Sequence, residues 1–207
     1  MYNPRKIPIK IARQKPPKGW SKLNIDASFD SVIQKCGLGG IFRDAKGHWI
    51  VGFGKPSYEC GSLETEIKAL LEGLKMAEEW RMYLLVIETD SVEVIQSILQ
   101  GNRLYDDIVN ECRSLMHQQK EIILQHTFRQ GNSVAHHMTR KAKDQFEGKK
   151  TFVEAPSYLK CFVEKELLEQ CIFEKFLSYD ACNTLASLGN RSVLRDTKYA
   201  CNLLTPT

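Results

Sequence analysis

The 207-residue sequence lacks the features of a membrane-spanning or disulfide-stapled protein. No apolar run approaches the roughly 18 residues that a membrane-spanning helix needs. The seven cysteines are odd in number, with neither a C-x-x-C pair nor the paired spacing of a zinc ribbon, which favours thiols in a reducing compartment. The basic segment Met1–Pro17 has no apolar centre of the kind that a secretory signal carries. We therefore expect an intracellular protein, of the nucleus or cytoplasm, that is neither secreted nor embedded in a membrane.

Acidic residues are absent from the first 22 positions, which hold seven lysines and arginines. Residues 23–101 reverse this balance with seven basic and twelve acidic side chains, and residues 102–150 have nine basic against six acidic ones. Basic segments favour a polyanionic partner, which is held through phosphate contacts. The acidic middle suits such a partner only where its carboxylates hold metal ions; otherwise the charges simply solubilise the surface.

Hydrophobic periodicity and turn residues predict an α/β order in which antiparallel strands precede strands connected by helices. The composition, 43% apolar and 26% charged, is typical of a chain that buries a core. The predicted strands are Trp20–Phe29, Gly37–Phe42, His48–Phe53, Tyr83–Glu88 and Ile122–Phe128, and the predicted helices are Ser62–Arg81, Ser91–Gln100, Ile108–Gln118 and Val134–Lys143. This order predicts a mixed sheet packed by helices.

The sequence divides into three parts. Residues 1–18 hold four prolines and many cations, which predicts a flexible basic arm. Residues 19–147 carry the predicted sheet and its helices. In the C-terminal extension, residues 148–207, loosely helical spacing predicts one amphipathic helix over Leu159–Leu177, and the remainder is expected to be disordered. This extension either docks on the domain or binds a protein partner.

Three carboxylates stand where the predicted elements could bring them to one site. Asp26 lies in mid-strand, where it is either a desolvated group that needs a partner or part of a solvated edge strand. Glu66 lies in the first turn of a predicted helix and is otherwise a partner of the helix dipole. Asp90 ends a buried strand, where ligands of α/β proteins bind, and is otherwise a helix N-cap. Together they are hard oxygen ligands suited to two Mg²⁺ ions.

Five blocks in order over residues 16–147 resemble the plant ribonuclease H-type domains related to non-LTR retroelement polyproteins. These blocks are Pro16–Phe29, Gly37–Asp44, Glu64–Leu70, Ile87–Ser91 and Phe128–His136. The resemblance implies the ribonuclease H-like fold, an α/β fold with a five-stranded mixed sheet flanked by helices. It also implies a metal-dependent endonuclease that hydrolyses the RNA strand of RNA–DNA hybrids with two Mg²⁺ ions, or Mn²⁺ in their place.

Carried over position by position, the resemblance assigns Asp26, Glu66 and Asp90 as catalytic metal ligands. His136 stands where ribonuclease H enzymes generally have a fourth acid, and it is assigned to the catalytic set with them. An imidazole suits Mn²⁺ or Zn²⁺ better than Mg²⁺. This histidine either ligates the second ion, moves a proton, or forms a surface pair with His137.

The candidates for nucleic-acid contacts are Arg129, Asn132, Gly39 and Gly40. Arg129 precedes the last predicted helix and can reach a phosphate, whereas the glycines would let the backbone approach the sugar–phosphate chain, although strand glycines also mark bulges. His126, on the preceding strand, does not align clearly with the mobile histidine that helps bacterial enzymes release product. The three acids favour an active nuclease. The alternative is an inactive or weakly active module that binds nucleic acid or protein, favoured by the fourth-acid histidine and the extension.

Overall fold

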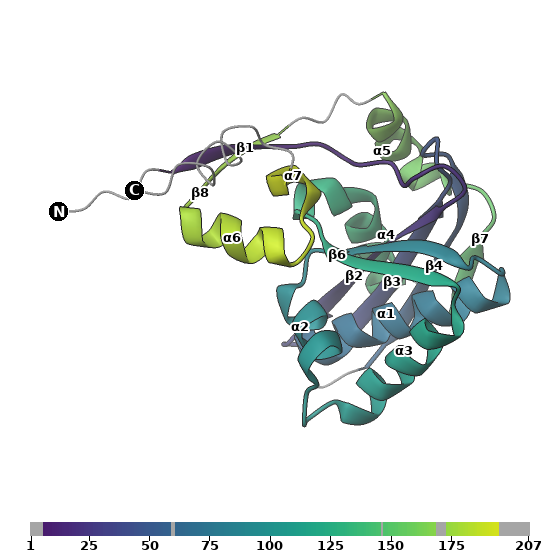
Figure 1. The fold of residues 1–207 in the computed structure, drawn as a ribbon. Helices are drawn as coiled ribbons and strands as arrows, with labels where there is room; N and C mark the ends of the chain where they lie inside the picture. The colour runs from purple at the N-terminus through teal and green to yellow at the C-terminus, as the bar shows by residue number, and fades with distance from the viewer. Residues whose placement is uncertain (1–5, 59–60, 146, 169–172, 195–207) are drawn as a thin grey trace.

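The structure, a computed structural model, describes residues 6–58, 61–145, 147–168 and 173–194. Its centre is a six-stranded mixed sheet in the order β6-β5-β2-β3-β4-β7 (Figure 1). The strands are β2 Ser21–Asp30, β3 Lys35–Arg43, β4 Trp49–Ser57, β5 Leu84–Thr89, β6 Glu121–His126 and β7 Lys150–Phe152. The five strands predicted from the sequence are confirmed, and β7 adds a short sixth strand beside β4.

β2 lies inside the sheet because it pairs on both sides. It is antiparallel to β3, with Asp26 opposite Gly39, and parallel to β5, with Asn24 opposite Glu88. The edge-strand alternative for Asp26 is therefore excluded. Successive side chains of the strand face opposite layers, so the apolar ones, such as Leu23, enter the core under α1 while Asp26 faces the other side.

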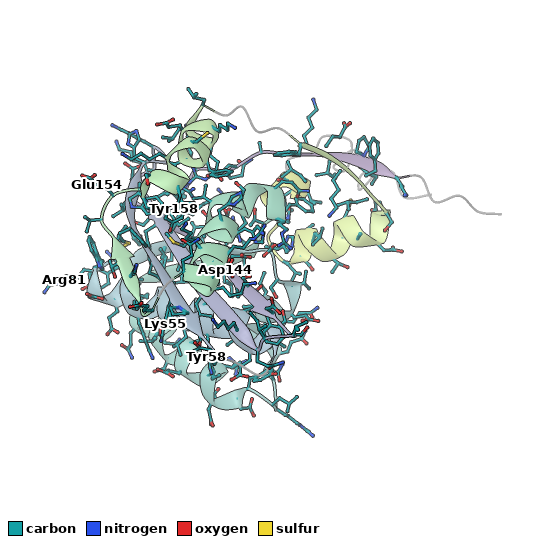
Figure 2. The ribbon with its side chains drawn as sticks, turned by 180° about the vertical axis from the view of Figure 1, so that it is seen from behind. Lys55, Tyr58, Arg81, Asp144, Glu154 and Tyr158 are labelled. Atoms are coloured by element: carbon teal, nitrogen blue, oxygen red, sulfur yellow. The ribbon has the colours of Figure 1, made fainter. Side chains whose placement is uncertain are left out.

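Helices cover both faces of this sheet. On one face α1 packs its apolar stripe on β2, with α2 and α3 beside it (Figure 1). On the other face α4 crosses β2 and β3, as the view from behind shows, with Asp144 near the end of the helix (Figure 2). These helices are α1 Ser62–Glu79, α2 Val92–Gln100, α3 Asp106–Gln118 and α4 Ser133–Gln145. Among the residues that the structure describes, no helix combines the length and apolar character that crossing a bilayer requires.

The glycines of β3 accommodate close packing on both faces of the strand. A Cβ on Gly37 would lie 2.0 Å from the carbonyl oxygen of Thr139, and one on Gly39 would lie 2.9 Å from Cγ2 of the same threonine. On the opposite face, a Cβ on Gly40 would lie 2.4 Å from Cε1 of Phe53. The prediction that Gly39 and Gly40 contact nucleic acid therefore does not fit their positions, because protein fills the space that the sequence analysis reserved for a sugar–phosphate chain.

The N-terminal arm contains a strand where the sequence analysis predicted a flexible segment. β1 Ile7–Ile11 pairs antiparallel with β8 Phe173–Leu177. The isoleucines alternate along β1 and their common face is buried, which stabilises the strand. Pro8 is tolerated because a two-stranded sheet consists of edge strands. Residues 1–5 lie outside the described residues.

The C-terminal extension also contains more regular structure than the sequence analysis predicted. Besides β7, its elements are α5 Ser157–Leu167, β8 Phe173–Leu177, α6 Tyr179–Ser187 and α7 Arg191–Leu194. The helix predicted over Leu159–Leu177 ends at Leu167, and the later part of that range pairs with β1 instead. α6 begins after Ser178, whose Oγ accepts a hydrogen bond from the backbone N–H of Ala181 at 3.2 Å. Residues 195–207 lie outside the described residues.

Candidate metal centre

Asp26 reaches the site from the middle of β2, under α4. Only 3% of the surface of Asp26 is accessible to solvent. Two side chains of α4 contact the same carboxylate oxygen, Oδ2: Thr139 Oγ1 donates to it at 2.9 Å, and His136 Nδ1 lies 3.1 Å away. α4 can come this close because Thr139 packs directly on Gly39, which pairs with Asp26 in the sheet. The helix thus fixes the orientation of the Asp26 carboxylate.

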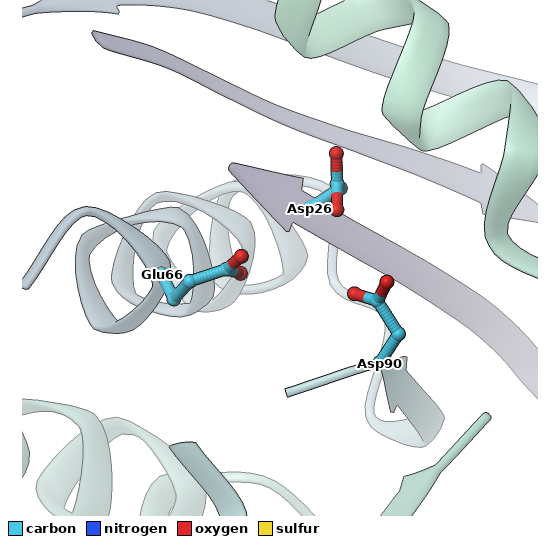
Figure 3. Close-up of side chains that lie close together, drawn as sticks. All are labelled: Asp26, Glu66 and Asp90. Carbon is cyan, nitrogen blue, oxygen red and sulfur yellow. The ribbon is translucent and has the colours of Figure 1, made fainter. Parts of the chain in front are cut away.

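Glu66 projects from α1 toward Asp26 (Figure 3). Because α1 begins at Ser62, Glu66 opens the second turn and not the first, so the assignment as a first-turn dipole partner was wrong. Its Oε2 is buried without a hydrogen-bond partner among the residues that the structure describes. Burial, and then the charges of Asp26 and Asp90, raise the pKa of Glu66 well above its usual value. A buried oxygen of this kind is destabilising unless a proton or a cation occupies it.

Asp90 directly follows β5, the parallel neighbour of β2. The N-cap of α2 is Ser91, whose Oγ accepts a hydrogen bond from the backbone N–H of Val94 at 3.3 Å. The N-cap alternative for Asp90 is therefore excluded. Burial and the charge of Asp26 raise the pKa of Asp90 to about 6, although the cationic Arg129 acts in the opposite direction.

The three carboxylates converge between β2, α1 and the end of β5 (Figure 3). One ligand atom from each lies within 4.8 Å of the other two. Among the described residues, neither lysine nor arginine forms an ion pair with any of these acids, which are Asp26, Glu66 and Asp90. Three hard oxygen donors in one small space, one of them with an unsatisfied buried oxygen, fit a divalent cation such as Mg²⁺ or Mn²⁺.

His136 and Arg129 form the nitrogen-bearing border of this site. The His136 side chain is 20% exposed and lies on Asp26. Arg129 Nη2 lies 3.1 Å from Nδ1 and 3.0 Å from Nε2 of the same imidazole, so the guanidinium contacts the ring directly. His137 turns instead toward α5 and stacks on Phe162, with ring centroids 3.9 Å apart. The two histidine rings also contact each other, with centroids 6.0 Å apart, so the surface pair exists beside the separate contacts that each ring makes.

Asn132 is buried beneath the site, with 2% of its surface exposed. Its Nδ2 donates to the carbonyl oxygen of Ile25 at 2.7 Å, which ties the start of α4 to the residue before Asp26. This position does not fit the prediction that Asn132 contacts nucleic acid. Arg129, in contrast, is exposed at the border, and its contact with a phosphate stays a prediction.

Two further residues belong to the surroundings of the acids. Thr139 was missed by the sequence analysis; it lies three positions after His136, and that helical spacing was the available signal. His126, at the end of β6, is 6% exposed. Burial lowers the pKa of His126 to about 4, so its imidazole is neutral near pH 7. Its burial sets it apart from a mobile histidine that releases product.

Comparison with known families shows where this geometry belongs. The model of the reverse transcriptase-like family matches residues 24–142, which include the three acids and His136. The chain belongs to the reverse transcriptase-like family. A relative from Arabidopsis thaliana, named as a candidate ribonuclease H protein, is 22% identical over 156 residues. That match covers 74% of this chain and 25% of the relative, so the chain spans about a quarter of the relative's length.

Solved structures match about three fifths of this chain. RNase H1 from the halophilic archaeon Halobacterium salinarum has a TM-score of 0.58 at 16% identity, covering 62% of this chain and 100% of that one. LC11-RNase H1, isolated from compost, was solved with an RNA/DNA hybrid; it has a TM-score of 0.55 at 14% identity, covering 60% and 97%. At these identities the likeness shows the fold. The domain is ribonuclease H-like, as the resemblance implied.

Proposed function

We propose that the chain is a divalent-metal-dependent endonuclease that hydrolyses the RNA strand of RNA–DNA hybrids. The observation that carries this proposal is the convergence of Asp26, Glu66 and Asp90 within 4.8 Å, without a lysine or arginine partner among the described residues. Two comparisons support it: the RNA/DNA hybrid bound by LC11-RNase H1, and the relative named as a candidate ribonuclease H protein.

In the proposed reaction the three acids hold two Mg²⁺ ions, or Mn²⁺ in their place. When bound, such ions supply an attacking water of lowered pKa and stabilise the leaving 3′-oxygen. Thr139 and His136 hold Oδ2 of Asp26, which keeps this carboxylate in one orientation. Arg129, exposed at the border, binds a phosphate of the substrate strand and fixes its register.

The direct test is cleavage of a hybrid labelled on each strand, with Mg²⁺ and Mn²⁺ in separate reactions and Asp90→Asn as the matched variant. We expect cleavage of the RNA strand alone, leaving 5′-phosphate and 3′-hydroxyl ends, and loss of that cleavage in the variant. Faster cleavage with Mn²⁺ would implicate His136, because an imidazole is the softer ligand. Cleavage retained by Asp90→Asn would contradict the assigned site.

A second candidate function is binding of nucleic acid or protein without cleavage. The observation that favours it is the placement of His136, which stands at the fourth-acid position and lies 3.1 Å from Asp26 Oδ2. Tight hybrid binding without cleavage in either metal would support this function instead. We also propose that residues 148–207 bind a protein partner. The cysteine pattern further supports a reducing compartment as the proposed location.

A further inference from the structure

β6 is an edge strand of the six-stranded sheet, and its only neighbour in that sheet is β5 (Figure 1). The backbone N–H of Glu121 donates to the carbonyl oxygen of Tyr83 at 3.0 Å, and the N–H of Thr127, six positions later, donates to that of Thr89 at 2.8 Å. Because backbone groups alternate in direction along a strand, the odd positions of β6 face β5 and the even positions face away from it. The N–H and C=O groups of Ile122 and Leu124 therefore point out of the sheet.

The C-terminal extension already occupies one end of this edge. The backbone N–H of His126, the next even position, donates to the carbonyl oxygen of Leu188 at 2.8 Å. Leu188 thus bonds to β6 as the backbone of an added strand would. The outward N–H groups of Ile122 and Leu124 have no hydrogen-bond partner in the part of the chain that the structure describes. Edge groups of this kind are a template on which an extended chain can pair.

A pocket with a volume of about 480 Å³ adjoins the open part of the edge. It lies where α2 and α3 end and β6 begins. Its apolar lining consists of Ile98, Leu99, Met116 and Ile122. Ile122 therefore belongs to both features, because its backbone faces the open edge and its side chain lines the pocket. A strand added at this edge would place alternate side chains on the side of the pocket.

Two polar groups of the pocket are positioned to bind a ligand. Arg113 Nε donates to the carbonyl oxygen of Ile98 at 2.8 Å, which fixes the guanidinium at the end of α2. None of the ion pairs among the described residues involves Arg113, so its charge is available to a carboxylate. Gln119 is 9% exposed, and its Oε1 is buried without a hydrogen-bond partner among the same residues. The pocket thus offers a preorganised cation and an acceptor that needs a donor.

The charges around the pocket favour an acidic peptide. Arg113, His117 and Lys120 line it, against the single acid Glu121. A glutamate side chain matches this lining, because its methylene groups suit the apolar residues and its carboxylate suits Arg113. A nucleic-acid strand does not match the edge, since phosphodiester linkages have no N–H groups to donate to the outward carbonyls of Ile122 and Leu124.

We propose that the edge of β6 at Ile122–Leu124 and the adjacent pocket bind an extended, acidic peptide segment of a partner protein. The peptide adds a strand beside β6, and a glutamate on one face of that strand enters the pocket. This site lies within the family match and is separate from the partner proposed for residues 148–207. It does not depend on hybrid cleavage, so the two proposals fail independently.

The probe is the synthetic peptide acetyl-Ser-Thr-Val-Glu-Val-Thr-Ser-amide, whose β-branched residues favour an extended backbone. Its two threonines share a face with the glutamate, and their hydroxyl groups can donate to Gln119. The first control replaces the glutamate with lysine. The second pair of controls carries N-methyl groups either on the two valine amides or on the glutamate and the second threonine, which removes donors from one edge of the peptide at a time.

Amide hydrogen exchange of the full-length chain, measured by NMR, reads out the added strand. Without peptide, the outward amides of Ile122 and Leu124 should exchange at least about tenfold faster than the inward amide of Ile123, which serves as the internal reference. Saturating peptide should slow exchange at Ile122 and Leu124 by about tenfold or more and leave Ile123 nearly unchanged. One of the two N-methylated peptides should retain this protection and the other should lose it.

Peptide affinity, measured by fluorescence anisotropy, tests the pocket. Arg113→Gln should weaken binding by about tenfold, because a charge-assisted hydrogen bond is lost. The matched control is Arg140→Gln, which makes the same charge change on α4, on the other face of the sheet, and should leave the affinity within about twofold. Lys120→Gln, a change at an exposed position, should weaken binding by about two- to fivefold and serves if Arg113→Gln fails to fold.

Four outcomes would overturn the proposal. The first is the absence of protection at Ile122 and Leu124 with about 1 mM peptide, the weak end of the affinity scale. The second is equal binding of the glutamate and lysine peptides, and the third is equal binding of the two N-methylated peptides. The fourth is protection that rises with protein concentration without any peptide, together with a dimer in sedimentation velocity, because a second copy of the chain would then occupy the edge.

Discussion

Buried carboxylates lie in two neighbouring places on the same two strands, Glu88 in one and Asp26 with Asp90 in the other, and their surroundings are opposite. Asn24 and Asp26 are two residues apart on β2, as Glu88 and Asp90 are on β5 and just beyond it, so each pair shares one face of the sheet. Glu88 is 3% exposed and every oxygen of its carboxylate is hydrogen-bonded. One step along the strands, Asp90 lies with Asp26 in a cluster that lacks lysine and arginine partners among the described residues.

The Glu88 carboxylate is surrounded by donors. Lys22 Nζ lies 2.5 Å from Oε1, Gln125 Nε2 donates to the same oxygen at 2.9 Å, and Asn24 Nδ2 donates to Oε2 at 2.9 Å. Burial alone would raise the pKa of Glu88, but the charge of Lys22 and these hydrogen bonds hold it below its usual value. At Asp90 burial raises the pKa to about 6, with too little cationic charge nearby to reverse the effect.

We call Glu88 and its partners Lys22, Asn24 and Gln125 the paired region. This region also joins the flanking segments to the domain. Glu166 of α5 lies 2.6 Å from Nη2 of Arg43 and 3.4 Å from Nε of Arg13, and it accepts from Ser133 Oγ at 2.9 Å. Arg43 and Asn24 are hydrogen-bonded at 3.0 Å, which links this group to Glu88. The paired buried charges connect parts of the chain. The three acids without lysine or arginine partners are instead the groups expected to bind cations from solution.

We call Asp26, Glu66 and Asp90, which have no lysine or arginine partner among the described residues, the unpaired cluster. The largest effect should follow from Asp26→Asn, which removes one charge from this cluster. The loss of a metal-binding carboxylate should lower hybrid cleavage by about a thousandfold or more, since several kcal/mol of transition-state stabilisation depend on it. The midpoint of thermal unfolding should not fall, because a like-charge repulsion with Glu66 and Asp90 disappears. Retained cleavage in a folded variant would show that the assigned site is wrong.

The same chemical change in the paired region, Glu88→Gln, should act on stability instead. The amide cannot neutralise Lys22, which is 0% exposed, and breaking a buried ion pair by removing one partner costs about 3–5 kcal/mol. Urea unfolding followed by circular dichroism measures this loss. Cleavage per folded molecule should stay within about threefold of that of the unaltered chain. A variant of unchanged stability would contradict the contrast between the two regions.

The unpaired cluster should also make the metal-free protein less stable as the pH rises. The pKa of Asp90 is about 6 in the folded chain, above its ordinary value of 3.8, so the folded state binds more protons between these values. The free energy of unfolding therefore decreases from about pH 4 to about pH 6 through this group. Asp90→Asn should remove that decrease and stabilise the metal-free protein at pH 7 by about 1–2 kcal/mol, since solvent screens part of the charge.

Thermal unfolding in a chelator at pH 4 and pH 7 measures this difference. At pH 4 the variant and the unaltered chain should unfold at nearly the same temperature. Adding Mg²⁺ or Mn²⁺ at pH 7 should raise the unfolding temperature of the unaltered chain, because ligands that bind the folded state stabilise it. A larger stabilisation by Asp90→Asn at pH 4 than at pH 7 would reverse the expected sign and contradict the assignment.

The sequence was sufficient to predict the fold but not the contacts of the central sheet with the flanking segments. The alternation of apolar and polar residues predicted that Asp26 lies on the face opposite Leu23, and the apolar run before Asp90 predicted that this residue ends a buried strand. Both predictions depend only on local sequence patterns. The sequence was also sufficient to bring the three acids together, through the resemblance. The contact between Glu166 and Arg43 joins residues 123 positions apart, and no periodicity reports such a pairing.

Glycines were interpreted less well than carboxylates. Gly39 is required by the approach of α4, a segment distant in sequence, and Gly40 by the ring of Phe53, its pairing partner on the neighbouring strand β4. A glycine in a strand signals that something comes close, but the sequence alone cannot say whether that is protein or ligand. The 2.7 Å contact between Asn190 Nδ2 and His126 Nδ1, which joins residues 64 positions apart, is a long-range property of the same kind.

The smallest effect should follow from Thr139→Val, which keeps the shape of the side chain and removes the hydrogen bond to Asp26. The methyl group that packs on Gly39 is retained, so α4 should stay in place and the unfolding temperature should change little. Loss of one donor to a carboxylate is expected to lower kcat by about 3- to 30-fold, equivalent to roughly 1–2 kcal/mol. Thr139→Ser keeps the hydroxyl and should retain most of the cleavage rate. If serine lowers kcat and valine leaves it unchanged, packing on the glycine and not the hydrogen bond is what the threonine contributes, and the orientation of Asp26 is then maintained by His136 alone.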